Sequence, residues 1–379
     1  MLLSLIIILI LFSCYLLIML LFLVGLLRLK GAKGKAPVSG LKLTVVIPFR
    51  DEAIHLEAII SDLLAQSYPG ELFSVLMVND HSSDGAEELA ASLIQGRTGF
   101  SCVDLPGGME GKKEAIAFAL SLVKSHWILQ TDADCRIGPE FISSHMRYLE
   151  EFPSDMVCGM LTTGGGRGGF LEAFERLDLL SLNGSGAGSF PYGRPMMCSG
   201  ANMLYSFDLY RETRQFDPAG KTGSGDDMFL LIGARKLKKR VAHNPDRDCL
   251  VRTSPVGNTA ELIGQRIRWG AKSAYYGMAD IQFLAIVVVL VNLLVLFSTV
   301  LMIAEPASCS WLFPAIGSKM LVDFLLLAVS AGKTGQSSTL WWYIPVALVY
   351  PLYMAIVIAG SLLSRPGWKG RKVQESFLR

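Results

Sequence analysis

The chain has 379 residues, 51% of them hydrophobic, and a formal net charge of +2. Its mean hydropathy of +0.41 is too high for a soluble globular protein and indicates a membrane protein. The near-neutral charge gives no sign of a nucleic-acid partner, and we expect none. The seven cysteines form no C-x-x-C pair or Cys/His cluster, which argues against a zinc site or a disulfide framework and fits a reducing compartment.

The first segment, Leu2–Leu27, is apolar throughout and is long enough to cross a bilayer as a helix. It lacks the basic leader and the short apolar core of a cleaved signal peptide. Basic residues follow it directly: Arg28, Lys30, Lys33 and Lys35. Residues 1–28 are therefore predicted to be a transmembrane anchor. By the positive-inside rule, the N-terminus lies outside and the domain that follows is cytoplasmic. The expected location is the plasma, or inner, membrane.

Residues 41–280 have the composition of a soluble domain, and strands alternate with helices along them, which predicts an α/β domain with a mostly parallel sheet. The predicted strands are Leu43–Ile47, Phe73–Val78, Phe100–Val103, Trp127–Leu129 and Met156–Met160. The predicted helices are Ile54–Gln66, Ala86–Ile94, Lys112–Val123 and Pro139–Glu151, the last with proline in its first turn.

Acidic residues follow three of these strands. Asp51 and Glu52 follow the first strand, Asp80 the second, and Asp132 and Asp134 the fourth. Because ligands of open parallel sheets bind at the carboxyl ends of the strands, we expect one acidic rim that holds a metal and a polar ligand. Two carboxylates at this spacing can turn their oxygens toward one Mg²⁺ or Mn²⁺ ion, and such an ion is often shared with substrate phosphates.

These segments resemble the nucleotide-sugar half of the family 2 glycosyltransferases, which have the GT-A fold. The matching segments, in the order typical of the family, are Val45–Glu52, Val78–Gly85, Gly111-Lys112 and Asp132-Ala133-Asp134. The resemblance implies an α/β GT-A domain. The apolar segments before and after it add one N-terminal and about three C-terminal transmembrane or membrane-associated helices. The resemblance also implies a nucleotide-sugar donor.

The resemblance assigns the first acidic groups to the nucleotide. Glu52 and Asp80 are expected to hold its base and ribose, with Asp51 beside them. Pro48 and Arg50, in the same segment, are counted as further substrate-binding residues.

The chain departs from the family pattern at two positions, where Asn79 replaces the usual Asp and His81 the usual Gly. The Asn79 amide still accepts hydrogen bonds, so we expect this change to be tolerated. Lys112 is expected to contact the diphosphate or the base, because a lysine near a helix N-terminus beside glycine-rich backbone suits phosphate. By resemblance, Asp134 is the main metal ligand, and Asp132 contacts the nucleotide or the metal.

The acceptor side is expected around Ser199–Met203, where Gly200 lets backbone approach a ligand closely and Asn202 is a further substrate-binding candidate. The glycine-rich stretch Gly184–Gly193 is either a mobile loop over the active site or a connector. In the pair Asp226-Asp227, the family assigns the second member as the general base, and Asp226 is counted as a further substrate-binding residue. Such a base takes the proton of the acceptor hydroxyl. The structural alternative is that these are first-turn acids favoured by the helix dipole.

The predicted helix Thr259–Tyr275 contains a second family pattern. Gln265, Arg268 and Trp269 match the Gln-x-x-Arg-Trp motif of cellulose, chitin and hyaluronan synthases and ceramide glucosyltransferases. By resemblance, Arg268 stabilises the leaving diphosphate and Trp269 stacks on the acceptor. The alternative is an interfacial helix that places Arg and Trp at headgroup level.

Residues 281–364 are predicted to be transmembrane or interfacial helices, with Ile281–Ala304 and Leu340–Leu363 as clear spans. Between them, Trp311–Ser330 contains Lys319 and Asp323, which can pair on one helix face. This pair is either a functional site or a helix–helix contact.

Three spans after a cytoplasmic domain put the C-terminus outside, whereas the basic tail, residues 365–379, argues for inside. Either Trp311–Ser330 is re-entrant or interfacial, or the charge signal is overridden. Elsewhere, His243 is either a structural strand-end residue, which we favour, or a further metal ligand.

The sequence therefore predicts an inverting glycosyltransferase that moves a sugar from a nucleoside-diphosphate sugar, most simply UDP-linked, to a lipid or lipid-linked acceptor. One alternative is a processive polysaccharide synthase, with a glycan acceptor and partner subunits that complete a channel. Another is an inert nucleotide-sugar-binding subunit of a membrane complex. A nucleotidyltransferase shares the sheet and metal chemistry but does not call for Gln265–Trp269 beside a membrane span.

Overall fold

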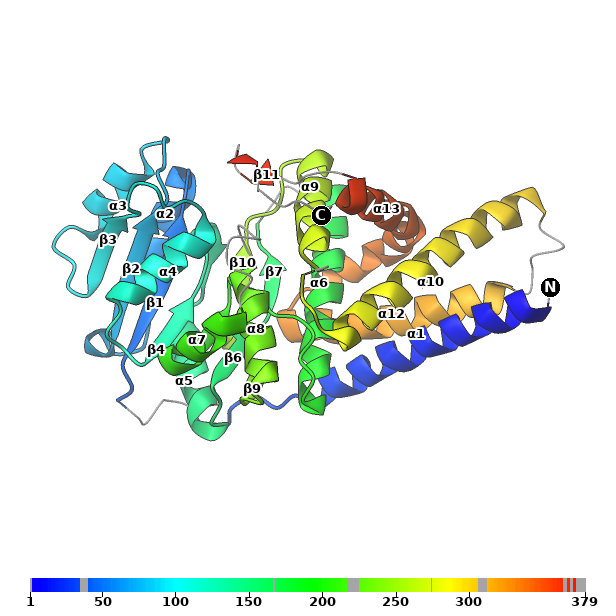
Figure 1. Cartoon of the computed structure of the whole chain (residues 1–379), viewed down its shortest axis with the longest axis horizontal. Coiled ribbons are helices and arrows are strands. Elements are labelled where there is room, and N and C mark those ends of the chain that lie inside the picture. The colour runs from blue at the N-terminus through cyan, green and yellow to red at the C-terminus, as the bar shows by residue number, and fades with distance from the viewer. Residues whose placement is uncertain are drawn as a thin grey trace. The chain divides into compact units, whose positions relative to one another are not determined.

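A computed structural model of the chain describes residues 2–34, 40–165, 168–216, 225–273, 275–305, 312–363, 367–368 and 371–372. The chain forms two compact units, whose elements are labelled in Figure 1. The sheet unit consists of Leu29–Gly165 and Phe190–Ser254. The helical unit consists of Met1–Arg28, Gly166–Ser189 and Pro255–Arg379. The range 41–280, expected from composition as one domain, thus contributes segments to both units.

The sheet unit is built on a seven-stranded sheet of order β3-β2-β1-β4-β8-β6-β9. Its strands are β1 (Leu43–Phe49), β2 (Phe73–Asn79), β3 (Phe100–Asp104), β4 (Trp127–Gln130), β6 (Met156–Gly159), β8 (Met203–Ser206) and β9 (Val241–Asn244). All neighbours pair in parallel except β8, which is antiparallel to β4 and β6. The sequence therefore predicted the mostly parallel sheet and its first strands to within one or two residues.

The helices of this unit include α2 (Ala53–Leu64), α3 (Ala86–Ile94), α4 (Lys112–Leu122), α5 (Phe141–Glu151), α7 (Phe207–Thr213) and α8 (Asp226–Lys236). Short 3₁₀ turns are η1 (Gly70–Leu72), η2 (Phe190–Tyr192), η3 (Arg214–Phe216) and η4 (Arg247–Cys249). A smaller sheet has the order β5 (Cys135–Arg136), β10 (Val251–Thr253), β7 (Leu161–Thr163). Helix α5 starts at Phe141, two residues later than predicted, and Glu140 is its N-cap.

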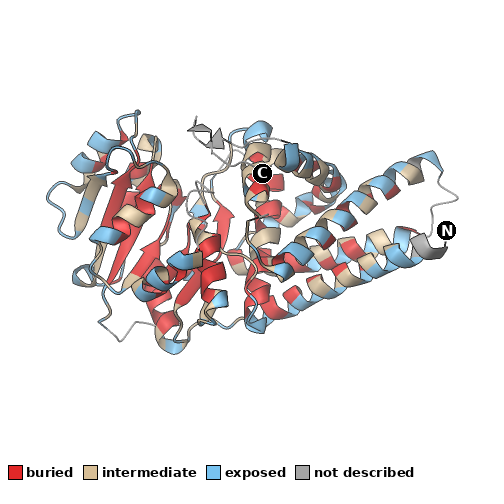
Figure 2. Ribbon diagram, viewed as in Figure 1, coloured by how far each residue is buried: buried red, intermediate tan, exposed pale blue. Residues whose placement is uncertain are grey.

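The central strands form the core of the sheet unit. All seven residues of β1 are buried, and Figure 2 shows the strands as the main buried layer. This burial matches the continuous apolar runs of the sequence, which are typical of parallel strands covered on both faces. Phe49 pairs with Asn79 and Val46 with Gln130, so the segments after β1, β2 and β4 leave the sheet at the same edge.

The helical unit contains α1 (Leu2–Arg28), α6 (Phe170–Ser189), α9 (Thr259–Ser273), α10 (Ala279–Ala304), α12 (Phe313–Thr334), η6 (Ser337–Trp342), α13 (Tyr343–Leu363) and a pair of two-residue strands, β11 (Gly367–Trp368) and β12 (Arg371–Lys372). Four segments within the described residues are long and apolar enough to cross a membrane: Ile6–Arg28, Ala279–Met302, Phe313–Thr334 and Ser337–Leu363. The predicted arrangement of one N-terminal and three C-terminal helices is thus confirmed. Arg365, Lys369 and Arg379 of the basic tail lie outside the described residues.

The glycine-rich stretch that starts at Gly184 is helical up to Ser189, at the end of α6, and is neither a loop nor a connector over that length. Helix α6 packs against α1 and α12. A Cβ on Gly188 would lie 2.1 Å from the Phe22 carbonyl oxygen, and one on Gly184 would lie 1.9 Å from Ser330 Oγ. The small residues therefore let these helices approach closely, as in membrane helix pairs.

Helices α1 and α12 also share a polar contact. Lys319 Nζ lies 2.6 Å from Asp323 Oδ2, and Tyr15 donates a hydrogen bond of 2.7 Å to Asp323 Oδ1. The Lys319 ammonium also lies 5.2 Å from the centre of the Tyr15 ring. The pair within Trp311–Ser330 thus makes the helix–helix contact that was one of its two interpretations.

Candidate active site

The ends of β1 and β2 are joined by hydrogen bonds around Asp51 and Asp80. Asp51 Oδ1 accepts a bond of 2.7 Å from the Ser83 amide, and the Asp51 amide donates to Ser82 Oγ at 3.0 Å. Asp80 is 1% exposed, and its Oδ2 accepts a bond of 3.0 Å from the Gly111 amide. Backbone amides thus hold both the buried Asp80 and the partly exposed Asp51 in position, and their carboxylate oxygens remain able to accept further bonds.

Arg50 adds a cation to this group. Its Nη1 donates to the Asp80 carbonyl at 3.0 Å, and its Nε lies 3.4 Å from Asp51 Oδ2. The structure thus brings together Arg50, Asp51 and Asp80, which the sequence predicted as neighbours. Pro48 differs from its expectation because it is buried within β1.

Asn79 lies between two acids, which explains why an amide stands there. Its Nδ2 donates to Asp104 Oδ1 at 2.9 Å and to Glu87 Oε2 at 3.3 Å, while its Oδ1 accepts from the Ser82 amide at 3.0 Å. The charge of Asp104 raises the pKa of Glu87, so the two acids already repel each other. An aspartate at position 79 would add a third negative charge.

Glu52 pairs with a residue that the sequence analysis missed. Its Oε2 lies 2.7 Å from His55 Nδ1, and His55 Nε2 lies 3.3 Å from Ser254 Oγ. Ser254 follows β10 and donates from its amide to the Asp134 carbonyl at 3.3 Å. The only sequence signal for His55 was its position one helical turn after Glu52.

The two carboxylates after β4 have different partners. Asp132 Oδ1 lies 2.6 Å from Lys112 Nζ, at the start of α4, and Asp134 Oδ2 accepts a bond of 3.1 Å from Thr253 Oγ1. Burial raises the pKa of Asp132, and the charge of Lys112 opposes that rise. Burial lowers the pKa of Lys112, but the charges of Asp132 and Asp226 outweigh it and raise the pKa above its ordinary value.

This pair fits a hard divalent cation. The described part of the chain holds no cluster of three or more His, Cys, Asp or Glu side chains that suits a metal. Asp132 uses Oδ1 for Lys112, and Asp134 uses Oδ2 for Thr253, while its Oδ1 has the weakly donating Cys135 thiol at 3.6 Å. One or two carboxylates, completed by water and substrate phosphates, are a common Mg²⁺ site.

Asp227 lies in the first turn of α8, after Gly225, whose φ of 100° favours glycine. Its Oδ2 accepts a bond of 3.0 Å from the Gly200 amide, and its Oδ1 accepts one of 2.8 Å from the Met228 amide. Amide donors and a helix N-terminus both stabilise a carboxylate in its charged form. The structure thus joins Gly200 and Asp227, which the sequence placed on the acceptor side.

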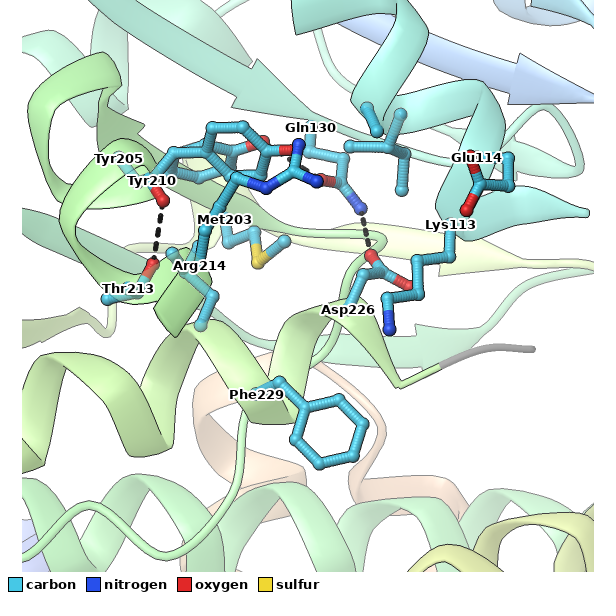
Figure 3. Close-up of a pocket in the computed structure, with 13 residues that line it drawn as sticks. Lys113, Glu114, Gln130, Met203, Tyr205, Tyr210, Thr213, Arg214, Asp226 and Phe229 are labelled. Atoms are coloured by element: carbon cyan, nitrogen blue, oxygen red, sulfur yellow. Dashed lines mark hydrogen bonds between the residues drawn. The ribbon is translucent and has the colours of Figure 1, made fainter. Parts of the chain in front are cut away.

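Asp226 points to a buried polar cluster that the sequence analysis did not identify. Gln130 Nε2 donates to Asp226 Oδ2 at 2.8 Å, and the Tyr205 hydroxyl donates to Gln130 Oε1 at 3.1 Å. A cavity of about 60 Å³ lies beside this group and is lined by residues of α4, β4, β8, α7, η3 and α8. Figure 3 shows the side chains that line it. A Cβ on Gly200 would lie 3.0 Å from Gln130 Nε2 and 3.4 Å from both Lys112 Nζ and Asp226 Oδ2.

Two further candidates have structural surroundings. Asn202 is 0% exposed, its Nδ2 donates to the Met160 and Cys249 carbonyls, both at 2.8 Å, and its Oδ1 lies 2.8 Å from His145 Nε2. It therefore differs from the expected ligand contact, because its amide is used inside the fold. His243 is buried in β9 with its ring edge against Phe190, as its structural interpretation expects.

In the helical unit, α9 carries the Gln265–Trp269 pattern. Its buried arginine is Arg266, which is 6% exposed and donates to Asp178 Oδ2 at 2.6 Å. The Arg266 guanidinium carbon lies 4.2 Å from the centre of the Trp269 ring, and Arg266 also donates to Gln265 Oε1. Arg268 is half-buried and Trp269 is 38% exposed. The motif residues Arg268 and Trp269 thus remain accessible, while Arg266 anchors the helix.

A mostly parallel sheet with acids at the carboxyl ends of its strands, and an acidic pair on a later helix, are typical of α/β domains that bind ligands at that edge of the sheet. Residues 44–214 match the family model described as Glycosyl transferase family 2. Residues 44–214 therefore match a family 2 glycosyltransferase domain, as the motifs indicated.

A solved structure has the same fold. A mannosyltransferase from Pyrobaculum calidifontis, solved in complex with GDP-Man and Mn²⁺, aligns with a TM-score of 0.57 at 14% identity, over 94% of this chain and 98% of that chain. The predicted GT-A fold with additional membrane helices is confirmed.

Two curated relatives were found. An N-acetylglucosaminyltransferase from Rhizobium meliloti (strain 1021) is 26% identical over 242 residues, or 61% of this chain. A poly(ribitol-phosphate) beta-glucosyltransferase from Bacillus spizizenii is 22% identical over 203 residues, or 52% of this chain. The matches cover 55% and 30% of the lengths of these two relatives.

Proposed function

We propose that the protein is an inverting glycosyltransferase that moves a sugar from a nucleoside-diphosphate sugar, UDP-linked, to a lipid or lipid-linked acceptor at the cytoplasmic face of the membrane. The observation that supports it most is the position of Lys112 between two acidic pairs. Its Nζ lies 2.6 Å from Asp132 Oδ1, and a Cβ on Gly200 would lie 3.4 Å from both Lys112 Nζ and Asp226 Oδ2. The proposed cation site and the proposed base would then belong to one cluster, and both curated relatives are named as glycosyltransferases.

The donor nucleotide would lie on the β1–β2 side of the sheet unit. Asp51, Glu52 and Asp80 would hold its base and ribose, because carboxylates accept hydrogen bonds from ribose hydroxyls and from base N–H groups. Arg50 fixes Asp80 through its carbonyl. Lys112 would add positive charge near the diphosphate.

Asp134 and Asp132 would hold Mg²⁺ or Mn²⁺, and the mannosyltransferase with this fold was solved with Mn²⁺. When bound, the cation would neutralise charge that develops on the leaving diphosphate. The chain's own residues would hold these ligands in place, because Thr253 donates to Asp134 and Lys112 pairs with Asp132.

Asp227 would act as the general base. As the acceptor oxygen forms its bond to the anomeric carbon, the bond from that carbon to the diphosphate oxygen breaks, and the acceptor proton passes to Asp227. The Gly200 and Met228 amides hold the carboxylate in one orientation. A single displacement of this kind inverts the configuration at the anomeric carbon.

On the helical unit, Arg268 would stabilise the leaving diphosphate, Trp269 would stack on the acceptor, and Gln265 would be a further substrate-binding residue. The four helices that are long and apolar enough to cross a membrane support a lipid-soluble acceptor. A glycan acceptor is the second candidate, because one relative is named for a poly(ribitol-phosphate) substrate.

The test is nucleotide release from a panel of UDP-, GDP- and dTDP-sugars. Protein purified in detergent is assayed with Mn²⁺, with Mg²⁺ or with EDTA, each with and without membrane lipid extract. We expect metal-dependent release with a UDP-sugar and a faster rate with lipid. Nucleotide binding without release from any donor would contradict the proposal and support an inert binding subunit.

A further inference from the structure

Gln130 is the last residue of β4 and lies two positions before Asp132. Its side chain is 0% exposed, and a buried amide normally has hydrogen-bond partners. It has two: the Tyr205 hydroxyl, which donates to Oε1 at 3.1 Å, and Asp226 Oδ2, which accepts from Nε2 at 2.8 Å. Figure 3 shows the second of these bonds along the wall of the cavity.

The partners fix which way the amide faces. An ionised carboxylate only accepts hydrogen bonds, so Nε2 must face Asp226, and Oε1 must face Tyr205. Burial raises the pKa of the Tyr205 hydroxyl well above its ordinary value, so Tyr205 keeps its proton and donates. Tyr205 itself is 1% exposed. The order Tyr205–Gln130–Asp226 therefore has one hydrogen-bonding pattern.

This amide joins the two halves of the proposed site. On one side, Gln130 lies two and four positions before Asp132 and Asp134 in the chain. On the other side, it holds Asp226, which directly precedes Asp227 in the first turn of α8. Gln130 also lies close to Gly200, since a Cβ on Gly200 would be only 3.0 Å from Gln130 Nε2. The Gly200 amide in turn donates a hydrogen bond to Asp227 Oδ2.

We propose that Gln130, oriented by Tyr205, is a positioning residue that holds Asp226 and thereby the first turn of α8, so that Asp227 faces the acceptor. This inference rests on the proposed function. Gln130 would not touch donor or acceptor, because it is fully buried. Its effect would fall on turnover and leave the donor nucleotide site on the β1–β2 side unchanged.

The test uses the whole protein in detergent and three measurements on each variant. These are turnover of the UDP-sugar that the wild type uses, with Mn²⁺ and lipid extract, binding of UDP with Mn²⁺, and thermal unfolding. The variants are Gln130→Leu, Tyr205→Phe, Asp226→Asn and the double variant Gln130→Leu/Asp226→Asn. Tyr68→Phe is the matched control, since Tyr68 is equally buried and donates to the Leu41 carbonyl at 2.6 Å, before β1 begins.

Loss of a hydrogen bond to a charged group is expected to lower the turnover of Gln130→Leu by about ten- to a hundredfold. UDP affinity should stay the same. Tyr205→Phe should lose turnover in the same direction but less, and Tyr68→Phe should lose only thermal stability. In the double variant, the Gln130 change should add nothing to the loss in Asp226→Asn, because residues that act as a unit are not additive.

Normal turnover in Gln130→Leu, or losses that multiply in the double variant, would overturn the positioning role alone. A wild type that turns over no donor would overturn the proposed function, and the positioning role with it. If Gln130→Leu does not fold, the comparison of Tyr205→Phe with Tyr68→Phe decides: equal turnover in these two variants contradicts the inference.

Discussion

Lys112 Nζ lies 2.6 Å from Asp132 Oδ1, so the first residue of α4 forms an ion pair with the first acid after β4. The charge of Asp226 also contributes to the raised pKa of this lysine. One lysine thus balances acids from two regions of the sheet unit. The sequence placed Lys112 beside phosphate, and the structure adds that it stabilises the acidic cluster itself.

Replacing Lys112 by Met should destabilise the protein and weaken nucleotide binding. Both side chains of the pair are less than one-third exposed, and loss of the cation leaves Asp132 without its partner, which we expect to cost about 1–3 kcal/mol. Thermal unfolding and titration with UDP in the presence of Mn²⁺ measure the two effects. Lys112→Arg keeps the charge and should recover most of the stability. Equal unfolding temperatures for Lys112→Met and the wild type would contradict this role.

Asn79→Asp should destabilise the sheet unit at neutral pH. The new carboxylate would face Asp104 and Glu87, and we expect a loss of about 1–3 kcal/mol relative to the wild type. Asn79→Ala removes the donor without adding charge, so it should lose less. The free energy of unfolding of Asn79→Asp and of the wild type is measured at pH 7 and at pH 4. The difference between the two proteins should be smaller at pH 4, because the carboxylates become protonated. A tolerated Asn79→Asp at pH 7 would show that the amide is not required.

Gly188→Ala should disturb the packing of α6 against α1. Its Cβ would lie 2.1 Å from the Phe22 carbonyl oxygen, and overpacking of this kind costs about 1–3 kcal/mol. Gly317→Ala in α12 is the control, because nothing lies within 4 Å of its Cβ position and alanine favours a helix. Thermal unfolding in detergent compares them. If both variants unfold at the same temperature, the close approach of α6 and α1 is not supported.

Because His145 is buried, the free energy of unfolding of the protein should decrease in mild acid. Its burial lowers its pKa to about 4, against an ordinary value of 6.5. Between pH 4 and pH 6.5, His145 binds a proton in the unfolded chain but not in the folded protein. The stabilisation that comes from keeping this side chain neutral is therefore fully present above pH 6.5 and is lost as the pH falls toward 4. The contribution is about 3 kcal/mol at most. Unfolding free energy measured from pH 7 to pH 4.5 should fall less steeply in His145→Gln, and parallel slopes would contradict the prediction.

The sequence predicted the parts of the site that depend on local pattern. Acids directly after apolar strands, such as Asp80 and Asp132, reach the same sheet edge because parallel strands end together. Asp227 was found for a similar reason, as an acid at a helix start. Each of these positions can be read within a window of about ten residues.

The contacts that hold the site could not be predicted in this way. Gln130 and Asp226 are 96 positions apart, and His55 and Ser254 are 199 positions apart, so no local pattern connects them. The family pattern in α9 pointed to Arg268 as the important arginine. In the structure the buried arginine is Arg266, because Asp178 of the same unit lies beside it and accepts its hydrogen bond. Glycine content suggested a loop, while close helix packing kept the residues before Ser189 helical.

The most direct test of the central claim follows labelled sugar from a UDP-sugar into an organic-extractable product, with Mn²⁺ and membrane lipid extract. Wild type and Asp227→Asn are compared, and UDP binding is measured for both. We predict that the wild type forms a labelled lipid, that Asp227→Asn forms none, and that both bind UDP equally, because Asp227 removes the acceptor proton without holding the nucleotide. Normal transfer by Asp227→Asn would contradict the assignment of the base.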